Sequence, residues 1–468
     1  MISSLLLRTL PLSLLTLATV ASAQDAPPQG PPKFQFLRQN EDWSFLADSD
    51  EPRSGLDSLK YISLSEDGDV WVSIGGRLVT RFENWNNFNF GAPPGISHDD
   101  DFILTRARVH ADLHVGDDVR VFGEIKTAQA TDRDLPGGRR TLDFDTLDLQ
   151  QAFVDWKVPG TGENPLNLRI GRQMMSFGAN RLVSPLPWGN ALRAWDGITA
   201  SQTHGAWDVT ALATAFVPVD KTDLNEADTH ELLYGVYAQT KTEGGGKDLY
   251  WLGNQRRTAM YNGTAGAAQR QTFGMRWYQG KNTTTDSEVE VAYQLGEVGS
   301  EDVRAWSIAS QFGYRPDGGS TRYWVGVDAA SGDDNPGGSV GTFDQLYPLG
   351  HAYFGYIDAI GRQNIFDTSL GATWKPAKKL SLTLGGHSFW LFSKDDAIYN
   401  AGGGIVRAPG SFDSSWIGWE VDATATWRHD QRMTTQVGVS QFYAGDALES
   451  SGPSDDATFG YIQFSYSF

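Results

Sequence analysis

Arginines gather in the first half of the sequence, at spacings that would place several of them along one surface. The residues concerned are Arg77, Arg81, Arg106, Arg108, Arg120, Arg169, Arg172 and Arg193, with Lys126 among them. A guanidinium group keeps its charge at physiological pH and presents a planar fork of N–H donors that grips a carboxylate with two hydrogen bonds. A row of such groups would form a ladder of moderate binding sites for a chain of anions.

Three carboxylates lie among these arginines in the sequence: Glu83, Asp112 and Glu124. They would temper each cationic site and keep the long arginine side chains extended. The competing interpretation is that each arginine pairs with a carboxylate beside it, but a track for anions better explains a cluster of this size. The nearby Phe122 and Phe153 would either stack on sugar rings or pack against an in-folded loop.

Signatures of catalysis and of metal binding are weak. The chain has eight histidines and no cysteine, and it contains neither a G-x-S-x-G nor an H-E-x-x-H motif. His110 and His114 share a strand face, but alternate residues lie too far apart to grip one metal ion. His351, Asp358 and Ser369 fall near one another without anything that orders them. We therefore expect no enzyme activity, no metal and no cofactor.

The composition narrows the class of protein. The chain has 468 residues with 57 acidic and 38 basic side chains, and its net charge of −19 argues against general affinity for nucleic acid. The absence of cysteine excludes a disulfide scaffold, and a mean hydropathy of −0.37 is too polar for a helical membrane protein. Glycines (52) and aromatic residues (12%) are abundant. A barrel wall that alternates between lipid and water fits these figures.

The N-terminus has the features of a secretory signal peptide over residues 1–23. A run rich in leucine and alanine ends in Ala21-Ser22-Ala23, and we expect cleavage near Ala23. Residues 24–68 would then form a periplasmic tether, proline-rich at its start, that leads into a barrel formed by residues 69–468. No later stretch supplies the ~18 apolar residues of a membrane-spanning helix.

From Val70 onward the hydrophobic pattern has a period of two, which is typical of strands with one apolar and one polar face. In residues 103–115, for example, Ile103 and Val109 alternate with Arg106 and Arg108. The last ten residues alternate in the same way and end on Phe468. This C-terminal strand resembles the recognition signal of outer-membrane barrels.

Short turns and long polar loops alternate along the chain. We expect long loops near 86–101, 129–145, 177–192, 217–231, 255–269, 332–364, 393–414 and 444–458. The acidic run 98–101 indicates a solvated loop, with a Ca²⁺ site as the alternative. The spacing predicts an all-β fold, a transmembrane antiparallel up-and-down β-barrel of about eighteen strands in the bacterial outer membrane, wide enough for an aqueous channel. A secreted β-sandwich or β-propeller is the alternative.

Four groups of motifs carry a family resemblance. They are the run 40–46 with 59–62 and 75–77; the run 169–173 with 181–183, Trp188, Asn190, Arg193 and Asp196; the run 330–333 with 343–348, His351, Asp358 and Arg362; and the run 418–422. Together they are similar to the alginate export family of outer-membrane porins, from about residue 38 to residue 468.

This resemblance implies an eighteen-stranded barrel with an arginine-rich constriction that passes an anionic polysaccharide, partly occluded by loops and a periplasmic turn. It implies that Arg77, Arg169, Arg172, Arg193 and Arg362 contact carboxylates, and that Asp196, Asp328 and Glu420 are the acidic partners that hold these arginines. The turns at 157–165 and 279–287 are short for the family, so a long periplasmic plug is not expected.

The sequence therefore predicts an anion-selective outer-membrane porin for an acidic, alginate-like polysaccharide or its oligosaccharides. Passage is expected to be by diffusion, because the sequence contains no motif for an energy source. The alternatives are a general or small-solute uptake porin on the same scaffold, and a barrel enzyme or surface-binding protein with an occluded lumen. Expected partners are the glycan, outer-membrane lipid and lipopolysaccharide, the barrel-assembly machinery through the Phe468 strand, and periplasmic export partners, but not nucleic acid.

Overall fold

The structure is a computed structural model that describes residues 34–48, 55–242, 244–280, 283–410 and 412–468. The predicted signal peptide and the proline-rich start of the tether lie outside the described residues. No helix in the part of the chain that is described is long and apolar enough to cross a membrane.

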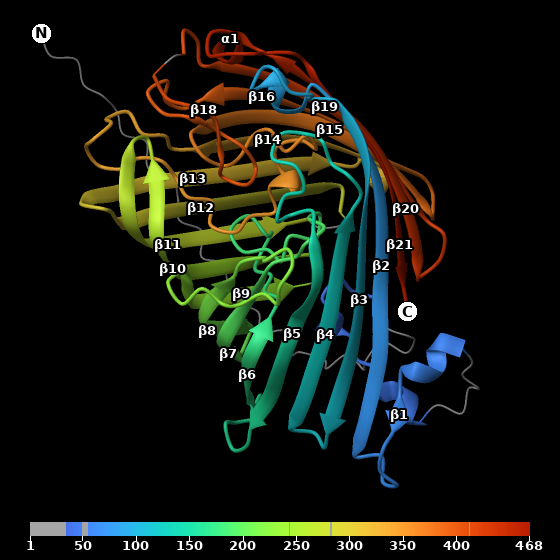
Figure 1. Ribbon diagram of the computed structural model, residues 1–468. Coiled ribbons are helices and arrows are strands. Elements are labelled where there is room, and N and C mark those ends of the chain that lie inside the picture. Colours follow the sequence, from blue (N-terminus) through green and yellow to red (C-terminus); the bar gives the residue numbers. More distant parts are fainter. Residues whose placement is uncertain (1–33, 49–54, 243, 281–282, 411) are drawn as a thin grey trace, which may run out of the picture. The chain divides into compact units, whose positions relative to one another are not determined.

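Eighteen antiparallel strands follow one another in chain order and close on themselves (Figure 1). They are β2 (Val70–Asn86), β3 (Asp100–Val115), β4 (Val119–Ala130), β5 (Asp145–Val158), β6 (Leu166–Gln173), β7 (Ala194–His204), β8 (Trp207–Val217), β9 (Leu232–Thr242), β10 (Gly245–Tyr261), β11 (Thr264–Gln279), β12 (Thr285–Val298), β13 (Glu301–Tyr314), β14 (Thr321–Ala330), β15 (Ile365–Ala377), β16 (Leu380–Leu391), β19 (Trp416–Arg428), β20 (Met433–Ala444) and β21 (Ala457–Ser467). The predicted closed barrel of about eighteen strands is confirmed.

The remaining elements are short. β1 (Ile62–Ser63) pairs with the start of β2, and β17 (Ile398–Tyr399) with β18 (Ile405–Arg407) forms a small hairpin between β16 and β19. One α-helix, α1 (Asp446–Glu449), and 3₁₀ turns at Arg38–Asn40, Ser44–Asp48, Gly55–Leu59, Phe88–Gly91, Pro316–Gly318 and Gly350–Ala352 complete the described part. In bacterial barrels the rim with short turns faces the periplasm, so the start of β2 and the end of β21 lie at the periplasmic rim.

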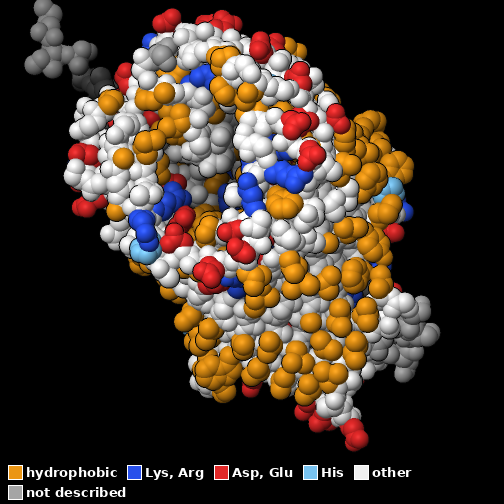
Figure 2. All heavy atoms as spheres, viewed as in Figure 1, with side chains coloured by type: hydrophobic (Ala, Val, Ile, Leu, Met, Phe, Trp, Pro, Cys, Tyr) orange, Lys and Arg blue, Asp and Glu red, His pale blue; other side chains and the backbone are white. Residues whose placement is uncertain are grey.

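The barrel wall has two faces, as the period of two predicts. Outward side chains are apolar and exposed, among them Leu370 (65%), Val325 (56%) and Ile170 (52%). Polar side chains such as Arg108 and Glu124 alternate with the outward ones and are only 1% exposed. Figure 2 shows hydrophobic side chains gathered over the lower strands and charged ones around a hollow above them.

The prediction of a long loop at 255–269 is wrong. β10 and β11 continue through this stretch and are joined by a turn at Asn262 and Gly263, with a bulge between Arg256 and Ala259. The stretch is polar because its inward side chains bind an in-folded loop: Arg256 lies 2.7 Å from Asp344. The other seven predicted loops lie at connections between strands.

The barrel closes where β2 meets β21, a junction that we call the seam. Their ladder runs from Arg77–Ser467 to Asn86–Thr458. Beyond it, Gly76 and Phe468 exchange two backbone hydrogen bonds, each 3.0 Å long. A Cβ atom at residue 76 would lie 2.7 Å from the Phe468 ring and 2.7 Å from the carbonyl oxygen of Arg108. The seam therefore leaves no room for a side chain at Gly76.

We expect Gly76→Ala to lower the free energy of unfolding by about 1–3 kcal/mol, because the added methyl group overlaps backbone as well as the ring. Urea unfolding in detergent micelles, read from heat-modifiable migration on gels, measures this loss. Gly123→Ala is the matched control, since a Cβ atom at Gly123 has no neighbour within 4 Å. Equal stability of the two variants would contradict a tightly packed seam.

Candidate functional site

Four arginines from two neighbouring strands meet on the inner face of the barrel: Arg77 and Arg81 of β2, and Arg106 and Arg108 of β3. We call them the arginine wall. The strand register places Arg77 directly opposite Arg108. Arg81, Arg106 and Arg108 are buried. Like charges held this close away from water are costly unless other groups face them.

The loop between β6 and β7 folds into the lumen and supplies part of what faces the wall. Arg106 donates to the carbonyl oxygens of Gly189 and, at 3.3 Å, of Pro187. Arg81 donates to the carbonyl oxygen of Trp188 at 2.9 Å, and its guanidinium carbon lies 3.8 Å from the centroid of the Trp188 ring. The partners that this loop offers are therefore neutral carbonyl groups and an aromatic face.

A second segment reaches the wall from the periplasmic side. It comprises residues 34–48, and we call it the N-terminal plug. The carbonyl oxygen of Phe36 accepts a hydrogen bond of 3.0 Å from Arg108. The Phe36 ring lies 4.7 Å from the guanidinium of Arg108 and 5.7 Å from that of Arg77, within the range of a cation–π contact.

Arg38 ties the N-terminal plug to the seam of the barrel. It donates to the carbonyl oxygens of Gly76 at 2.7 Å and Phe468 at 2.9 Å. Its own carboxylate partner is Glu41, 2.7 Å away, and both side chains are almost completely buried. The plug is thus held where the first and last strands join.

Most cations on this side of the lumen, including two of the arginine wall, are paired with a carboxylate. The pairs are Arg169–Asp155 (2.7 Å), Arg120–Asp112 (2.6 Å), Lys126–Asp145 (2.8 Å), Arg81–Glu83 (2.6 Å) and Arg108–Glu124 (3.3 Å). Within the described ranges, Arg77 and Arg106 form no ion pair. The excess of positive charge therefore lies on the arginine wall.

Arg172 and Asp196 lie apart from the wall. Arg172 binds Asp196 through two hydrogen bonds of 2.7 and 3.0 Å. Strand alternation places Arg172 on the same face as Ile170, whose side chain points outward. These two residues therefore form a pair near the external end of β6 and β7, away from the arginines of β2 and β3.

The remaining predicted site residues contact the loop between β14 and β15, residues 331–364. Arg193 donates to the carbonyl oxygen of Pro348 at 2.7 Å, and burial lowers the pKa of its guanidinium to about 10, so it stays charged at neutral pH. Arg362 lies 2.7 Å from Asp328. Glu420 accepts a hydrogen bond of 2.9 Å from the backbone N–H of Ile357 and forms no ion pair with an arginine of the described chain.

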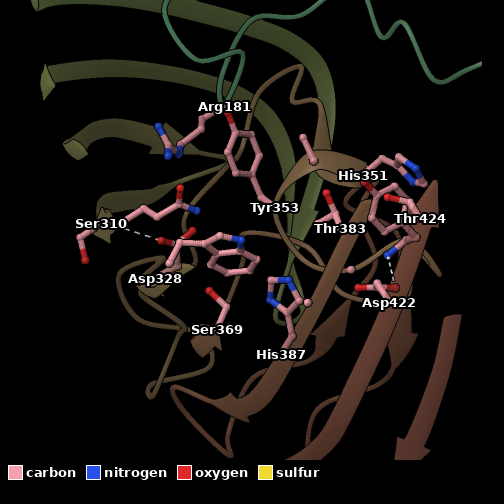
Figure 3. A pocket seen from close by; sticks show the side chains of 17 residues that line it. Arg181, Ser310, Asp328, His351, Tyr353, Ser369, Thr383, His387, Asp422 and Thr424 are labelled. Carbon is pink, nitrogen blue, oxygen red and sulfur yellow. Dashed lines mark hydrogen bonds between the residues drawn. The ribbon is translucent and has the colours of Figure 1, made fainter. Parts of the chain in front are cut away.

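An aromatic stack joins two of the in-folded loops. The ring of His351 stacks on Trp188 with a centroid distance of 3.7 Å and an interplanar angle of 9°. His351 borders a cavity of about 280 Å³ that Arg81 and Arg193 also line, and a second cavity of about 200 Å³ on another side (Figure 3). His351 therefore borders both cavities, whereas Arg81 and Trp188 line only the first.

The N-terminal plug was not predicted from the sequence, because only a periplasmic turn was considered as a possible plug. Those turns, 159–165 and 280–284, are indeed short. The missed signal was the group of aromatic residues Phe34, Phe36 and Trp43 around Arg38, which is unusual for a tether. Among the described residues, no group of three or more His, Asp or Glu side chains is placed to hold a metal ion.

A closed eighteen-stranded barrel with an apolar outer face and a charged lumen is an outer-membrane porin. Residues 70–461 match the alginate export family, and the chain belongs to that family. No curated protein matches the sequence.

Solved structures share the fold at low sequence identity. The Pseudomonas aeruginosa porin OccK2 (OpdF), in complex with glucuronate, is 11% identical with a TM-score of 0.55, over 87% of this chain and 98% of that one. OpdK of the same organism, with vanillate, is 10% identical with a TM-score of 0.55, over 84% and 98%. A BenF-like porin of Pseudomonas fluorescens Pf-5 is 12% identical with a TM-score of 0.57, over 85% and 99%.

We expect Arg38→Ala to undock the N-terminal plug, because loss of one partner of a buried ion pair costs about 3–5 kcal/mol. Hydrogen exchange of the 34–48 backbone should accelerate by at least about tenfold. Arg304→Ala is the control, since that side chain is 67% exposed. Unchanged exchange in the Arg38 variant would show that the plug does not depend on this contact.

Lys60 should make docking of the N-terminal segment depend on pH. Its ammonium donates to the carbonyl oxygen of Ile74 at 2.9 Å, and burial, reinforced by the nearby Arg38, lowers its pKa from 10.5 to about 8. As the pH rises, Lys60 loses its proton at a lower pH when the segment is docked than when it is undocked. Docking should therefore tighten between about pH 8 and about pH 10.5 and should not change with pH below that range. Protection of the segment from proteolysis measures this trend, and Lys60→Met should abolish it.

Proposed function

We propose that the protein is an anion-selective pore through which an acidic polysaccharide of the alginate type, or its oligosaccharides, diffuses across the outer membrane. One observation carries the proposal. Arg77 and Arg106 form no ion pair within the described ranges, and Arg106 donates to the carbonyl oxygens of Gly189 and Pro187, which carry no net charge. The wall therefore holds positive charge that a carboxylate of the substrate would neutralise.

The energetics favour such an exchange. A hydrogen bond from a guanidinium to a carboxylate is about twice as strong as one to a neutral acceptor. A buried cation without a counter-ion is also unfavourable, and an arriving carboxylate removes that cost. Because each carbonyl belongs to a loop or to the N-terminal plug, binding of the anion would compete with the segments that fill the lumen.

The arrangement suits a polymer better than a single small ion. Arg77 and Arg81 are four residues apart on β2, a rise of about 13 Å along the strand. A uronate polymer presents one carboxylate on every sugar, and a chain that spans this rise carries several carboxylates, so one polymer could contact both arginines at once. Each contact must remain weak enough to release the chain, and the neighbouring Glu83 and Glu124 lower the net charge of the wall accordingly.

The second candidate function is uptake of small solutes on the same scaffold. Two similar structures, OccK2 (OpdF) and OpdK, are complexes with glucuronate and with vanillate, which are small carboxylates. At 10–12% identity this likeness speaks for the fold. We further propose that residues 1–23 direct export and are removed near Ala23, and that the strand ending at Phe468 is the contact for the barrel-assembly machinery.

We expect the channel in a planar bilayer under a KCl gradient to prefer chloride and to be blocked by an oligouronate. Arg81→Gln combined with Arg106→Gln should shift the reversal potential toward zero and weaken the block by about tenfold or more, since each lost charge-assisted hydrogen bond is worth about 1.5–3 kcal/mol. Arg304→Gln combined with Arg428→Gln, at exposed sites, changes the total charge equally and should do neither. A pore that is cation-selective and indifferent to uronate would favour the small-solute alternative.

A further inference from the structure

The lumen has a second lining of different chemistry. Among the inward side chains of β15, β16 and β19, six in the part nearer the periplasm are uncharged and bear hydroxyl groups. These are Ser369, Thr373, Ser381, Thr383, Thr424 and Thr426, which we call the hydroxyl wall. They alternate with outward residues such as Leu370, Leu384 and Trp427, which are 65%, 58% and 49% exposed. The six side chains of the hydroxyl wall are half-buried and therefore border open space.

The strand register makes this wall continuous. Thr373 is directly opposite Thr383, which is in turn opposite Thr424, and Ser381 is opposite Thr426. The hydroxyls of Thr373 and Thr383 lie 3.2 Å apart. Within the described part of the chain, those of Ser369 and Ser381 make no side-chain hydrogen bond. They are free to bind a group in the lumen.

An aromatic ring lies on the same surface. Trp324 of β14 points inward, between Tyr323 and Val325, which are 52% and 56% exposed to lipid. A Cβ atom at Gly371 would lie 2.4 Å from the Trp324 indole, and one at Gly385 would lie 3.3 Å from it. Two adjacent strands thus lack side chains where the indole packs, and Trp324 remains half-buried at the edge of a cavity.

This cavity, of about 200 Å³, is the one shown in Figure 3, where Ser369, Thr383 and Thr424 surround it. Tyr353 and Tyr356 of the β14–β15 loop also border it. It is smaller than the ~300–1,000 Å³ pockets that enclose drug-sized ligands, which suits one ring of a larger chain.

Most of the charged groups around the cavity are already engaged. Arg181 binds Glu290 at 2.8 Å, and His387 binds Asp367 at 3.2 Å. Asp328 is held by Arg362, as described above. What the cavity leaves available is hydroxyl groups, aromatic faces and the carboxylate of Asp422, which accepts a hydrogen bond of 3.3 Å from the backbone N–H of Tyr356 and forms no ion pair within the described chain. These groups suit an uncharged part of a ligand that carries hydroxyls.

We infer that the hydroxyl wall and Trp324 form a binding site for the ring of a sugar unit. A sugar ring has apolar C–H faces that stack on an aromatic ring, and hydroxyls that both donate to and accept from serine and threonine. The wall continues through β20 and β21 to the arginine wall, where Gln463 binds Arg81 at 3.1 Å. This inference rests on the proposed function for its substrate class and adds selection of carbohydrate acids over other carboxylates.

The test is isothermal titration of the full chain in detergent micelles with trigalacturonate and with tricarballylate, which carry the same number of carboxylates. Trigalacturonate should bind more tightly. Trp324→Ala should weaken its binding by about tenfold and leave tricarballylate unchanged, while Trp324→Phe should retain most of the affinity. Tyr323→Ala, on the lipid face of the same strand, is the matched control, and Thr383→Val removes one hydroxyl with little change of shape.

The outcomes separate this inference from the proposed function. If Trp324→Ala and Thr383→Val leave trigalacturonate binding unchanged in a barrel that migrates as folded, or if both acids bind equally, the sugar site is wrong and the anion pore stands. If neither acid binds but maltotriose binds in a Trp324-dependent manner, the sugar site stands and the anion pore is wrong. If none of the three binds, both are wrong.

Discussion

No water reaches the backbone of a strand in the hydrocarbon of a membrane, so every N–H and C=O group there must be paired within the sheet. This constraint forces β2 to find β21, and it leaves a single place for polar side chains, the lumen. Strand alternation then brings Arg77, Arg81, Arg106 and Arg108 together. The crowding of positive charge is a consequence of the closed sheet.

The crowded arginines in turn determine how the interior is filled. A buried donor without an acceptor is costly, so segments that offer acceptors are drawn to the wall. Phe36 brings a carbonyl oxygen from the N-terminal plug, and Trp188 brings one from the β6–β7 loop. Neutral acceptors satisfy the donors without removing the charge. An anion can therefore replace the carbonyl oxygens that hold the N-terminal plug and the β6–β7 loop in the lumen. Binding of the anion and displacement of these two segments are then linked equilibria.

The parts of this architecture that depend on local pattern were predictable from the sequence. The inward position of Arg108 and the outward position of Val109 follow from a period of two, and the strand count follows from the spacing of turns. The 255–269 hairpin was not, because its polar residues bind a loop from elsewhere in the chain, as Arg256 does with Asp344. The N-terminal plug depends on contacts such as Arg38 with Phe468, 430 residues apart, which no local pattern records.

A lining of arginine alone would serve a polyanion poorly. Several charge-assisted contacts on one chain add up to strong binding, and a pore must release what it binds. Contacts between charges also weaken as salt rises, over a screening distance of about 8–10 Å at ordinary ionic strength. Hydroxyl and aromatic contacts, like those that Thr383 and Trp324 offer, are individually weak and largely insensitive to salt. A lumen in which uncharged residues continue directly into cationic ones can therefore hold a charged sugar chain loosely under conditions where charge alone would bind it too tightly or not at all.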